Sequence, residues 1–217
     1  MITLKLASDA DLAWAQAQVS QHHYLHSPVD SRCSVLAYVV MAHGERAGCL
    51  LFGRPESTRC YRGELTYGGQ ADVASGRARF DRWEVINLAR VWLDPRLQRG
   101  GIWEVGCLAT MLMSEALKRV VVDYLQEYPP CYINEPWRLR ACLSYCDTRI
   151  HSGTIYKAAG FTLARTNASG IQTWYRPLRG LQGRERKLIE RYCAQSYRSR
   201  CYRSQRAALS EQLTFAL

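Results

Sequence analysis

The segment from Leu143 to Phe161 constrains the fold more than any other part of the 217-residue sequence. Cys142 and Leu143 end an apolar run typical of a strand, and His151-Ser152-Gly153 leads into a short helical pattern that stops at Gly160. A carboxylate, phenols and a hydroxyl lie between the two elements. Because ligands of open α/β sheets bind beyond the carboxyl ends of strands, the segment predicts an α/β domain with a chemical site at this loop.

The remaining patterns up to residue 176 alternate between strand-like and helix-like periods. They predict a helix from Asp9 to Val19, a hairpin of residues 34–41 and 47–53, a strand over 85–93, a helix over 103–125, a strand over 137–143, and a closing hairpin of 162–164 and 171–175. The Gly- and Arg-rich residues 55–82 are expected to form a long loop or insertion. We therefore predict an α/β domain over residues 1–176, in which a mixed central sheet is flanked by helices, and a basic helical extension over 177–217.

Composition restricts the functional classes. Hydrophobic residues make up 47% of the chain, which is enough for a packed core. The nine cysteines are irregularly spaced and contain no Cys-x-x-Cys pair, which argues against a zinc site or a disulfide framework. The first nine residues lack a secretory pattern, and no apolar run reaches the roughly 20 residues that a membrane-spanning helix needs. We expect a cytoplasmic protein without membrane contact, and its oligomeric state is left open, a dimer included.

The positive charge of the chain is concentrated near its end. The formal net charge is +10, and residues 176–206 alone contribute +8, mostly from arginine. Arginine suits phosphate and the interspersed tyrosines offer stacking surfaces, so this extension predicts contact with nucleic acid. The residues expected to make it are Arg184, Arg186, Lys187, Arg191, Arg198, Arg200 and Arg203. A solvated amphipathic helix docked through its leucines is the alternative.

Candidate catalytic residues are scattered along the chain. Asp147 follows a predicted strand end, where it would accept a proton or hold a metal, or else cap the next helix or pair with Arg149. His23 lies in a histidine-rich loop suited to a metal or to a general base. Arg90 is a charge inside an apolar strand, where it would bind a carboxylate or phosphate of a donor, or form a structural ion pair with Glu84 or Asp147. Ser144 is expected to face the site in preference to its neighbour Tyr145.

Two pieces of the sequence resemble the GCN5-related N-acetyltransferase fold. Residues 88–95 followed by Gln98-Arg99-Gly100-Gly101 resemble the strand, loop and helix that hold the pyrophosphate of coenzyme A, and residues 151–161 resemble the last helix of that fold. The resemblance implies that Arg99, Gly100 and Gly101 bind an acyl-CoA-like donor. The position that is usually a small residue is Trp103, whose indole would crowd the phosphate-binding amides and argues against ordinary use of acetyl-CoA.

A more specific resemblance, over roughly residues 20–166, is to the phage Mom proteins. It is carried by His23-Tyr24, residues 47–53, Leu88-Ala89-Arg90-Val91, residues 143–147, and His151-x-Gly153-Thr154-Ile155-Tyr156 with Ala158. Mom proteins hypermodify adenine in DNA by adding a carbamoylmethyl group at N6, which protects viral DNA from host restriction.

The Mom resemblance implies a site, a cofactor and a partner for this chain. The implied catalytic residues are Asp147, Tyr156, His23, Tyr24, Arg90 and Ser144. The implied metal is iron, held by His23, Asp147 and Tyr156, and the implied partner is double-stranded DNA in the host cytoplasm. The alternatives are an ordinary acyl-CoA-dependent N-acetyltransferase and a DNA-binding relative without catalytic activity.

Overall fold

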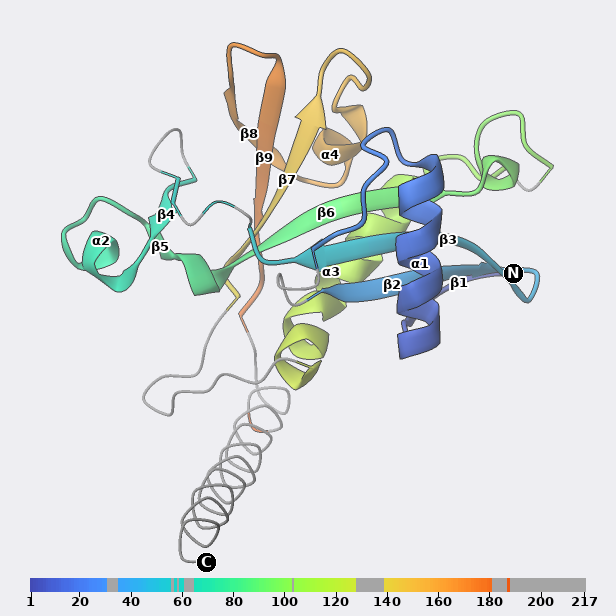
Figure 1. Cartoon of the computed structure of the whole chain (residues 1–217), viewed down its shortest axis with the longest axis horizontal. Helices are drawn as coiled ribbons and strands as arrows, with labels where there is room; N and C mark the ends of the chain where they lie inside the picture. Colours follow the sequence, from blue (N-terminus) through green and yellow to red (C-terminus); the bar gives the residue numbers. More distant parts are fainter. Residues whose placement is uncertain are drawn as a thin grey trace, which may run out of the picture.

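A seven-stranded sheet in the order β1-β2-β3-β6-β7-β9-β8 forms the centre of the molecule (Figure 1). The computed structural model describes residues 1–30, 35–55, 57, 59–60, 65–102, 104–127, 139–180 and 187. The strands of the sheet are β1 (Ile2–Leu6), β2 (Leu36–Ala42), β3 (Glu45–Gly53), β6 (Val85–Leu93), β7 (Ala141–Asp147), β8 (Thr162–Thr166) and β9 (Ile171–Pro177). All neighbouring strands run antiparallel except β6 and β7, which are parallel. The predicted mixed sheet is confirmed.

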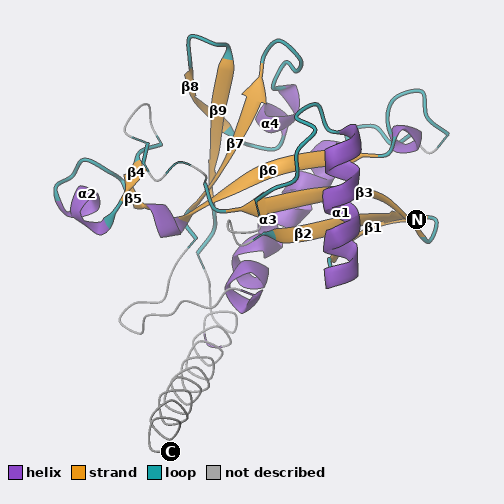
Figure 2. Cartoon of the chain, in the orientation of Figure 1, coloured by secondary structure: helices purple, strands orange, loops and turns teal. Residues whose placement is uncertain are grey.

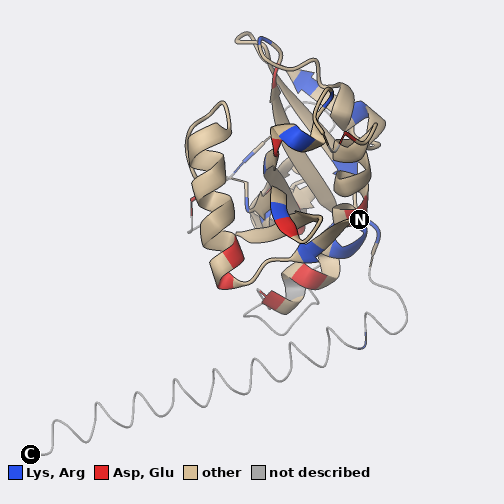
Figure 3. Ribbon diagram, turned by 90° about the vertical axis from the view of Figure 1, so that its right-hand side faces the viewer, with Lys and Arg blue, Asp and Glu red and all other residues tan. Residues whose placement is uncertain are grey.

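Helices cover both faces of the sheet (Figure 2). The helix α1 (Asp9–His22) begins at Ser8, whose side chain accepts a hydrogen bond from the Asp11 amide, while Asp11 bonds back to the Ser8 amide. Figure 3 shows the two acids in its first turn, where carboxylates are stabilised by the positive end of a helix. On the opposite face lie α3 (Leu108–Glu127) and α4 (Thr154–Ala158). Among the described residues, none of the helices is long and apolar enough to span a membrane.

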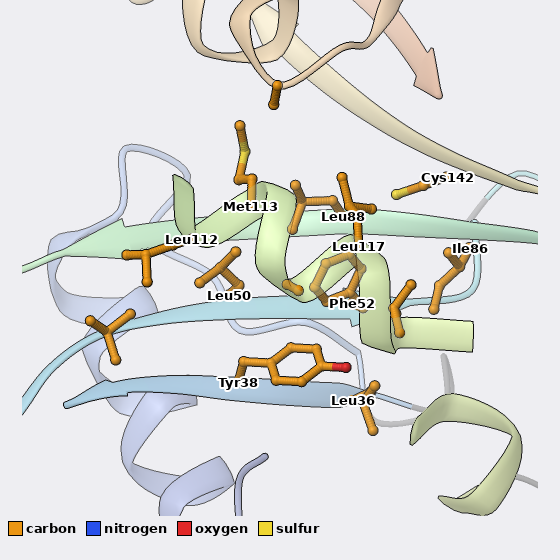
Figure 4. Packing of buried hydrophobic residues seen from close by; sticks show 14 of the residues in the cluster. Leu36, Tyr38, Leu50, Phe52, Ile86, Leu88, Leu112, Met113, Leu117 and Cys142 are labelled. Atoms are coloured by element: carbon orange, nitrogen blue, oxygen red, sulfur yellow. The ribbon is translucent and has the colours of Figure 1, made fainter. Parts of the chain in front are cut away.

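Strand β3 shows how the two faces separate. Cys49 and Leu51 pack under α1, whereas Leu50 and Phe52 pack under α3, as period-two alternation requires. Figure 4 shows α3 placed over Leu50 and Phe52, with its own Met113 and Leu117 in the same core. These side chains have almost no exposed surface, so this layer is the main core of the domain.

The insertion at residues 55–82 is more ordered than the sequence predicts. It contains β4 (Tyr67–Gly68), α2 (Gln70–Ala74) and β5 (Phe80–Asp81), followed by the 3-10 turn η2 (Arg82–Glu84). Strands β4 and β5 pair in parallel as a separate two-stranded sheet. Figure 1 places this unit at the end of the main sheet where β6 begins. The expectation of a loop is therefore wrong for these residues.

Three further boundaries differ from the predictions. Helix α3 begins at Leu108 rather than at residue 103, because Gly106 and Cys107 form a turn and Cys107 has a left-handed backbone with φ 60°. Strand β7 begins at Ala141 and continues through Asp147, so Asp147 is its last residue rather than part of the loop. Strand β1 was missed, although Ile2, Leu4 and Leu6 alternate with Thr3 and Lys5 in the pattern typical of a strand.

Candidate functional site

The parallel strands β6 and β7 stay together for only three residue pairs, from Val85–Ala141 to Asn87–Leu143. Beyond that point β6 remains paired with β3 and β7 with β9, so the two strands part. At the point of parting, the Ser144 hydroxyl donates a hydrogen bond of 2.8 Å to the Leu88 carbonyl. That bond satisfies a backbone acceptor that no longer has a strand partner. Arg90 and Asp147 follow the separation on the two diverging strands.

The segment after α1 joins this place through aromatic contacts. The rings of His23 and Tyr24 are 4.4 Å apart, and the Tyr24 ring meets the His151 ring edge-on at 5.4 Å. Burial raises the pKa of Tyr24, and the nearby Asp147 charge raises it further while Arg90 opposes the shift. Three residues predicted from scattered motifs, His23, Arg90 and Asp147, are therefore gathered around Tyr24, together with His151.

Asp147 is buried and held by Arg149. Its carboxylate accepts bonds of 2.9 and 2.6 Å from two nitrogens of the Arg149 guanidinium, and a third of 3.0 Å from the Arg149 amide. The side-chain bonds from Arg149, followed by the backbone bond, lower the pKa of Asp147 to about 2. Asp147 is thus ionised at neutral pH. While the Arg149 guanidinium is bound, the Asp147 carboxylate stabilises a nearby positive charge but takes up a proton only weakly.

His23 is held as a neutral imidazole. Burial lowers its pKa to about 4, and the charges of Arg90, His151 and His26 lower it in the same direction. The Leu25 amide donates to His23 Nδ1 at 3.3 Å, which places the ring proton on Nε2. In this arrangement His23 presents a hydrogen-bond donor.

We expect an NMR titration of the His23 ring to show a midpoint near pH 4. Because the folded pKa lies below the unfolded value of about 6.5, the unfolded chain binds more protons between these pH values. His23 therefore makes the protein less stable as the pH falls through this window, and His23→Gln should flatten that dependence. Arg90→Gln should raise the midpoint, since one repelling charge is gone. A wild-type midpoint at or above 6.5 would show that the ring is solvated.

Tyr156 lies on α4 below the parting strands. Its hydroxyl donates to the Tyr145 carbonyl at 3.3 Å, and the Ser144 hydroxyl is a further hydrogen-bond partner. Burial is the main cause that raises the pKa of Tyr156 to about 12, so the phenol stays protonated. The ring packs on Phe161 and Trp174. Ser144 is buried and Tyr145 is 37% exposed, so the two do face opposite ways.

Arg90 is half-buried beside the segment that follows α1. Its guanidinium donates to the Ser27 carbonyl at 3.4 Å, the Ser27 hydroxyl at 3.3 Å and the Ala89 carbonyl at 2.8 Å. Its neighbour Ala89 is the extra residue of a β-bulge opposite Leu51 and Phe52 in β3. Bulges redirect side chains, which explains how a charge within an apolar strand reaches the site. Of the two structural alternatives for Arg90, Glu84 instead forms an ion pair of 3.5 Å with Arg140.

The predicted iron ligands do not fit a metal in this geometry. Both Asp147 oxygens accept hydrogen bonds from Arg149, the Tyr156 hydroxyl donates to the Tyr145 carbonyl, and His23 Nδ1 accepts from the Leu25 amide. Across the described part of the chain, there is no group of three His, Cys, Asp or Glu side chains able to hold a metal ion. The reaction proposed below therefore uses the side chains of the site without iron.

The predicted phosphate cradle is also altered. Gly100 has φ 81°, and a Cβ on Gly101 would lie 2.4 Å from the Arg96 carbonyl, so both glycines are required by a tight turn. The Gly100 amide, however, donates to the Glu104 carboxylate at 2.7 Å, and α3 begins only at Leu108. An acyl-CoA pyrophosphate would have to displace Glu104 to reach the Gly100 amide. Binding of such a donor by Arg99, Gly100 and Gly101 stays a prediction. Trp103 lies outside the described residues.

Asn87 was missed by the motif analysis. It lies on β6 at the last residue pair before the strands part, and it is 6% exposed. Its buried Oδ1 has no hydrogen-bond partner among the described residues. The signal in the sequence that could have identified Asn87 is a single amide within an apolar strand.

Another residue of the histidine-rich segment, His22, stacks on Trp92 with a distance of 5.5 Å between the ring centroids.

The basic extension is almost entirely outside the described residues. Of its seven predicted nucleic-acid contacts, Arg184, Arg186, Arg191, Arg198, Arg200 and Arg203 are not described. Lys187 is described and is exposed. Their contact with DNA stays a prediction, as does the domain boundary at residues 176 and 177.

Comparison with known families identifies the chain. The Mom protein family matches residues 6–177. The chain belongs to the Mom protein family. The match is wider than the roughly 20–166 inferred from motifs, and its span includes the insertion. No curated protein matches this Mom family sequence.

Solved structures similar to this Mom family member are acetyltransferases. An aminoglycoside acetyltransferase AAC(6')-Ib, in complex with coenzyme A and kanamycin, is 16% identical, with a TM-score of 0.49 over 82% of this chain and 95% of that chain. An N-acetyltransferase from Staphylococcus aureus Mu50 is 13% identical, with a TM-score of 0.48 over 82% and 99%. The ribosomal-protein-S18-alanine N-acetyltransferase from Escherichia coli is 14% identical, with a TM-score of 0.44 over 85% and 97%.

Proposed function

We propose that this Mom family member is a transferase that adds a small carbamoylmethyl-type group to N6 of adenine in double-stranded DNA. Membership of the family supports this function. The observation that carries it is the convergence of His23, Tyr24, Arg90 and Asp147 where β6 and β7 part. A protein that only binds DNA has no need for a buried carboxylate, a neutral imidazole and a guanidinium at one place.

The proposed reaction is a nucleophilic displacement by the adenine amine. The target base leaves the duplex stack, and an aromatic face such as Tyr24 holds it. The N6 lone pair forms a bond to the donor carbon, the leaving group departs with its bonding electrons, and the N6 proton passes to Asp147. Asp147 stabilises the positive charge that develops on N6, since its carboxylate is ionised. Arg149 has to release that carboxylate before it takes the proton.

Arg90 and Tyr156 have supporting roles in this scheme. The Arg90 guanidinium would orient the carbonyl of an amide or acidic donor, because it presents several donors in one plane. The protonated phenol of Tyr156 would donate a proton to the departing group, as a pKa of about 12 permits. Ser144 bridges β7 to β6 at the point where their pairing ends, through its hydrogen bond to the Leu88 carbonyl. The product would protect phage DNA from host restriction in the cytoplasm.

Nucleoside analysis tests the proposal directly. The full chain is expressed with a plasmid, the plasmid is digested to nucleosides, and these are separated and weighed by mass spectrometry. We expect a new adenine nucleoside whose added mass identifies the transferred group. An acetylated amine in place of it would favour the ordinary N-acetyltransferase. Unmodified nucleosides from cells that contain folded protein would contradict the proposed function.

A further inference from the structure

A tryptophan beside the insertion contacts the guanidiniums of two arginines. Arg54 Cζ is 3.8 Å from the centroid of the Trp83 ring, and Arg82 Cζ is 4.5 Å from the same ring. The Arg54 Nε also donates to the Tyr124 hydroxyl at 3.4 Å. Stacking occupies the flat face of a guanidinium and leaves its in-plane N–H groups for another acceptor. Both arginines are therefore held in place, with donors at their edges.

A second pair of arginines continues this arrangement. Arg79 Cζ lies 5.3 Å from the centroid of the Phe80 ring, and Arg140 Cζ lies 5.2 Å from it. The Arg140 amide donates to the Glu84 carbonyl, which connects this pair to the turn that carries Trp83. We call these two rings and the four arginines stacked on them the arginine–aromatic cluster.

The carboxylates near the cluster accept hydrogen bonds from backbone amides. Asp81 Oδ1 accepts from the Trp83 amide at 3.0 Å, and Glu84 Oε2 accepts from the Asp81 amide at 3.1 Å. Glu84 also approaches Arg140 at 3.5 Å. Within the part of the chain that is described, no carboxylate forms an ion pair with Arg54 or Arg82. The cluster is therefore a concentration of positive charge suited to an anion with several oxygens.

The cluster is connected to the candidate site through two phenols. Tyr67 pairs with Phe80 between β4 and β5, and its hydroxyl shares a hydrogen bond with Tyr145. Tyr145 lies on β7 two residues before Asp147. From Trp83 in η2 to Arg90 on β6 the chain advances seven residue steps, which span at most roughly 20 Å. Successive phosphates on one DNA strand are about 3.4 Å apart along the helix axis, so a duplex aligned with β6 would cover at most about six nucleotides over this span.

We propose that the arginine–aromatic cluster binds backbone phosphates of duplex DNA within about six nucleotides of the base being modified. The inference rests on the proposed function for its choice of DNA as the partner. The stacked guanidiniums would contact phosphate oxygens and carry no base preference. The insertion is then a docking element that fixes the duplex while the target base reaches the candidate site around Tyr24.

Fluorescence anisotropy with an unmodified 20-base-pair duplex tests the cluster. For Arg82→Gln in the full chain, we expect about tenfold weaker binding, the loss of one charge-assisted hydrogen bond. The slope of log affinity against log salt should fall in magnitude by about 1, and by about 2 for the double variant with Arg54→Gln. Both losses should be equal for two duplexes of unrelated sequence.

Lys118→Gln is the matched control, because Lys118 is an exposed cation on α3, away from the cluster. It should change neither the affinity nor the slope. An Arg82→Gln variant that folds normally and behaves like Lys118→Gln would overturn the inference, as would a wild-type chain that does not bind duplex at all. The binding assay does not depend on modification. If Arg82→Gln reduces the salt slope but the wild-type chain forms no new nucleoside, the proposed function is contradicted and the role of the cluster is not. Normal binding by the double variant beside normal modification would contradict the cluster alone.

Discussion

Asp147→Asn should abolish adenine modification while leaving affinity for duplex DNA within about twofold of wild type. An amide cannot take the N6 proton and does not stabilise the charge that develops there. General acid–base groups typically contribute about 10²–10⁴-fold to the rate, so a loss of at least about 100-fold is expected. Modification is measured as the yield of the new nucleoside, and affinity by anisotropy on the same preparation.

Arg149→Gln is the control for that substitution. It removes the other half of the same ion pair, and because the Arg149 side chain is 72% exposed, its loss should cost little stability. It leaves the carboxylate in place and lets its pKa rise from about 2 toward the ordinary value. This variant should therefore keep its activity. If it loses as much activity as Asp147→Asn, the pair acts as a structural unit and the proposed role of Asp147 is wrong.

Much of the fold follows from periodicity in the sequence. The hairpin of β2 and β3 and the buried strand β6 were predicted within a few residues, because apolar residues alternate or run continuously in each. Those elements build the core. The insertion could not be predicted, since β4 and β5 have two residues each and exist only through their parallel pairing. Elements this short have no sequence period of their own.

The candidate site was predictable as a set of residues but not as a geometry. Asp147, His23 and Arg90 could be selected as polar groups beside apolar strands. The sequence does not show that Arg149 closes over Asp147, nor that a bulge at Ala89 directs Arg90 toward the segment after α1. Iron was implied by the Mom resemblance, not by the residue types. The hydrogen-bond partners of Asp147 and His23 do not fit an iron site, and these partners are set only when the chain folds.

Phe52→Ala should destabilise the domain by about 3–5 kcal/mol, the range found when a buried phenylalanine is truncated. Phe52 has no exposed surface, and its ring meets the Tyr38 ring edge-on at 5.8 Å. Both lie in the layer under α3 (Figure 4), so the cavity would open at the centre of the core. Because domains of this kind are stable by only about 5–15 kcal/mol, the loss is a large part of the total. Urea unfolding followed by circular dichroism measures it.

Met111→Ala on α3 is the comparison, since Met111 is 58% exposed and its truncation should cost less than about 0.5 kcal/mol. The two variants together locate the stabilising layer, because both remove apolar atoms but only Phe52→Ala leaves an internal cavity. Equal urea midpoints for the two variants would mean that the layer under α3 is not the main stabilising core of the domain.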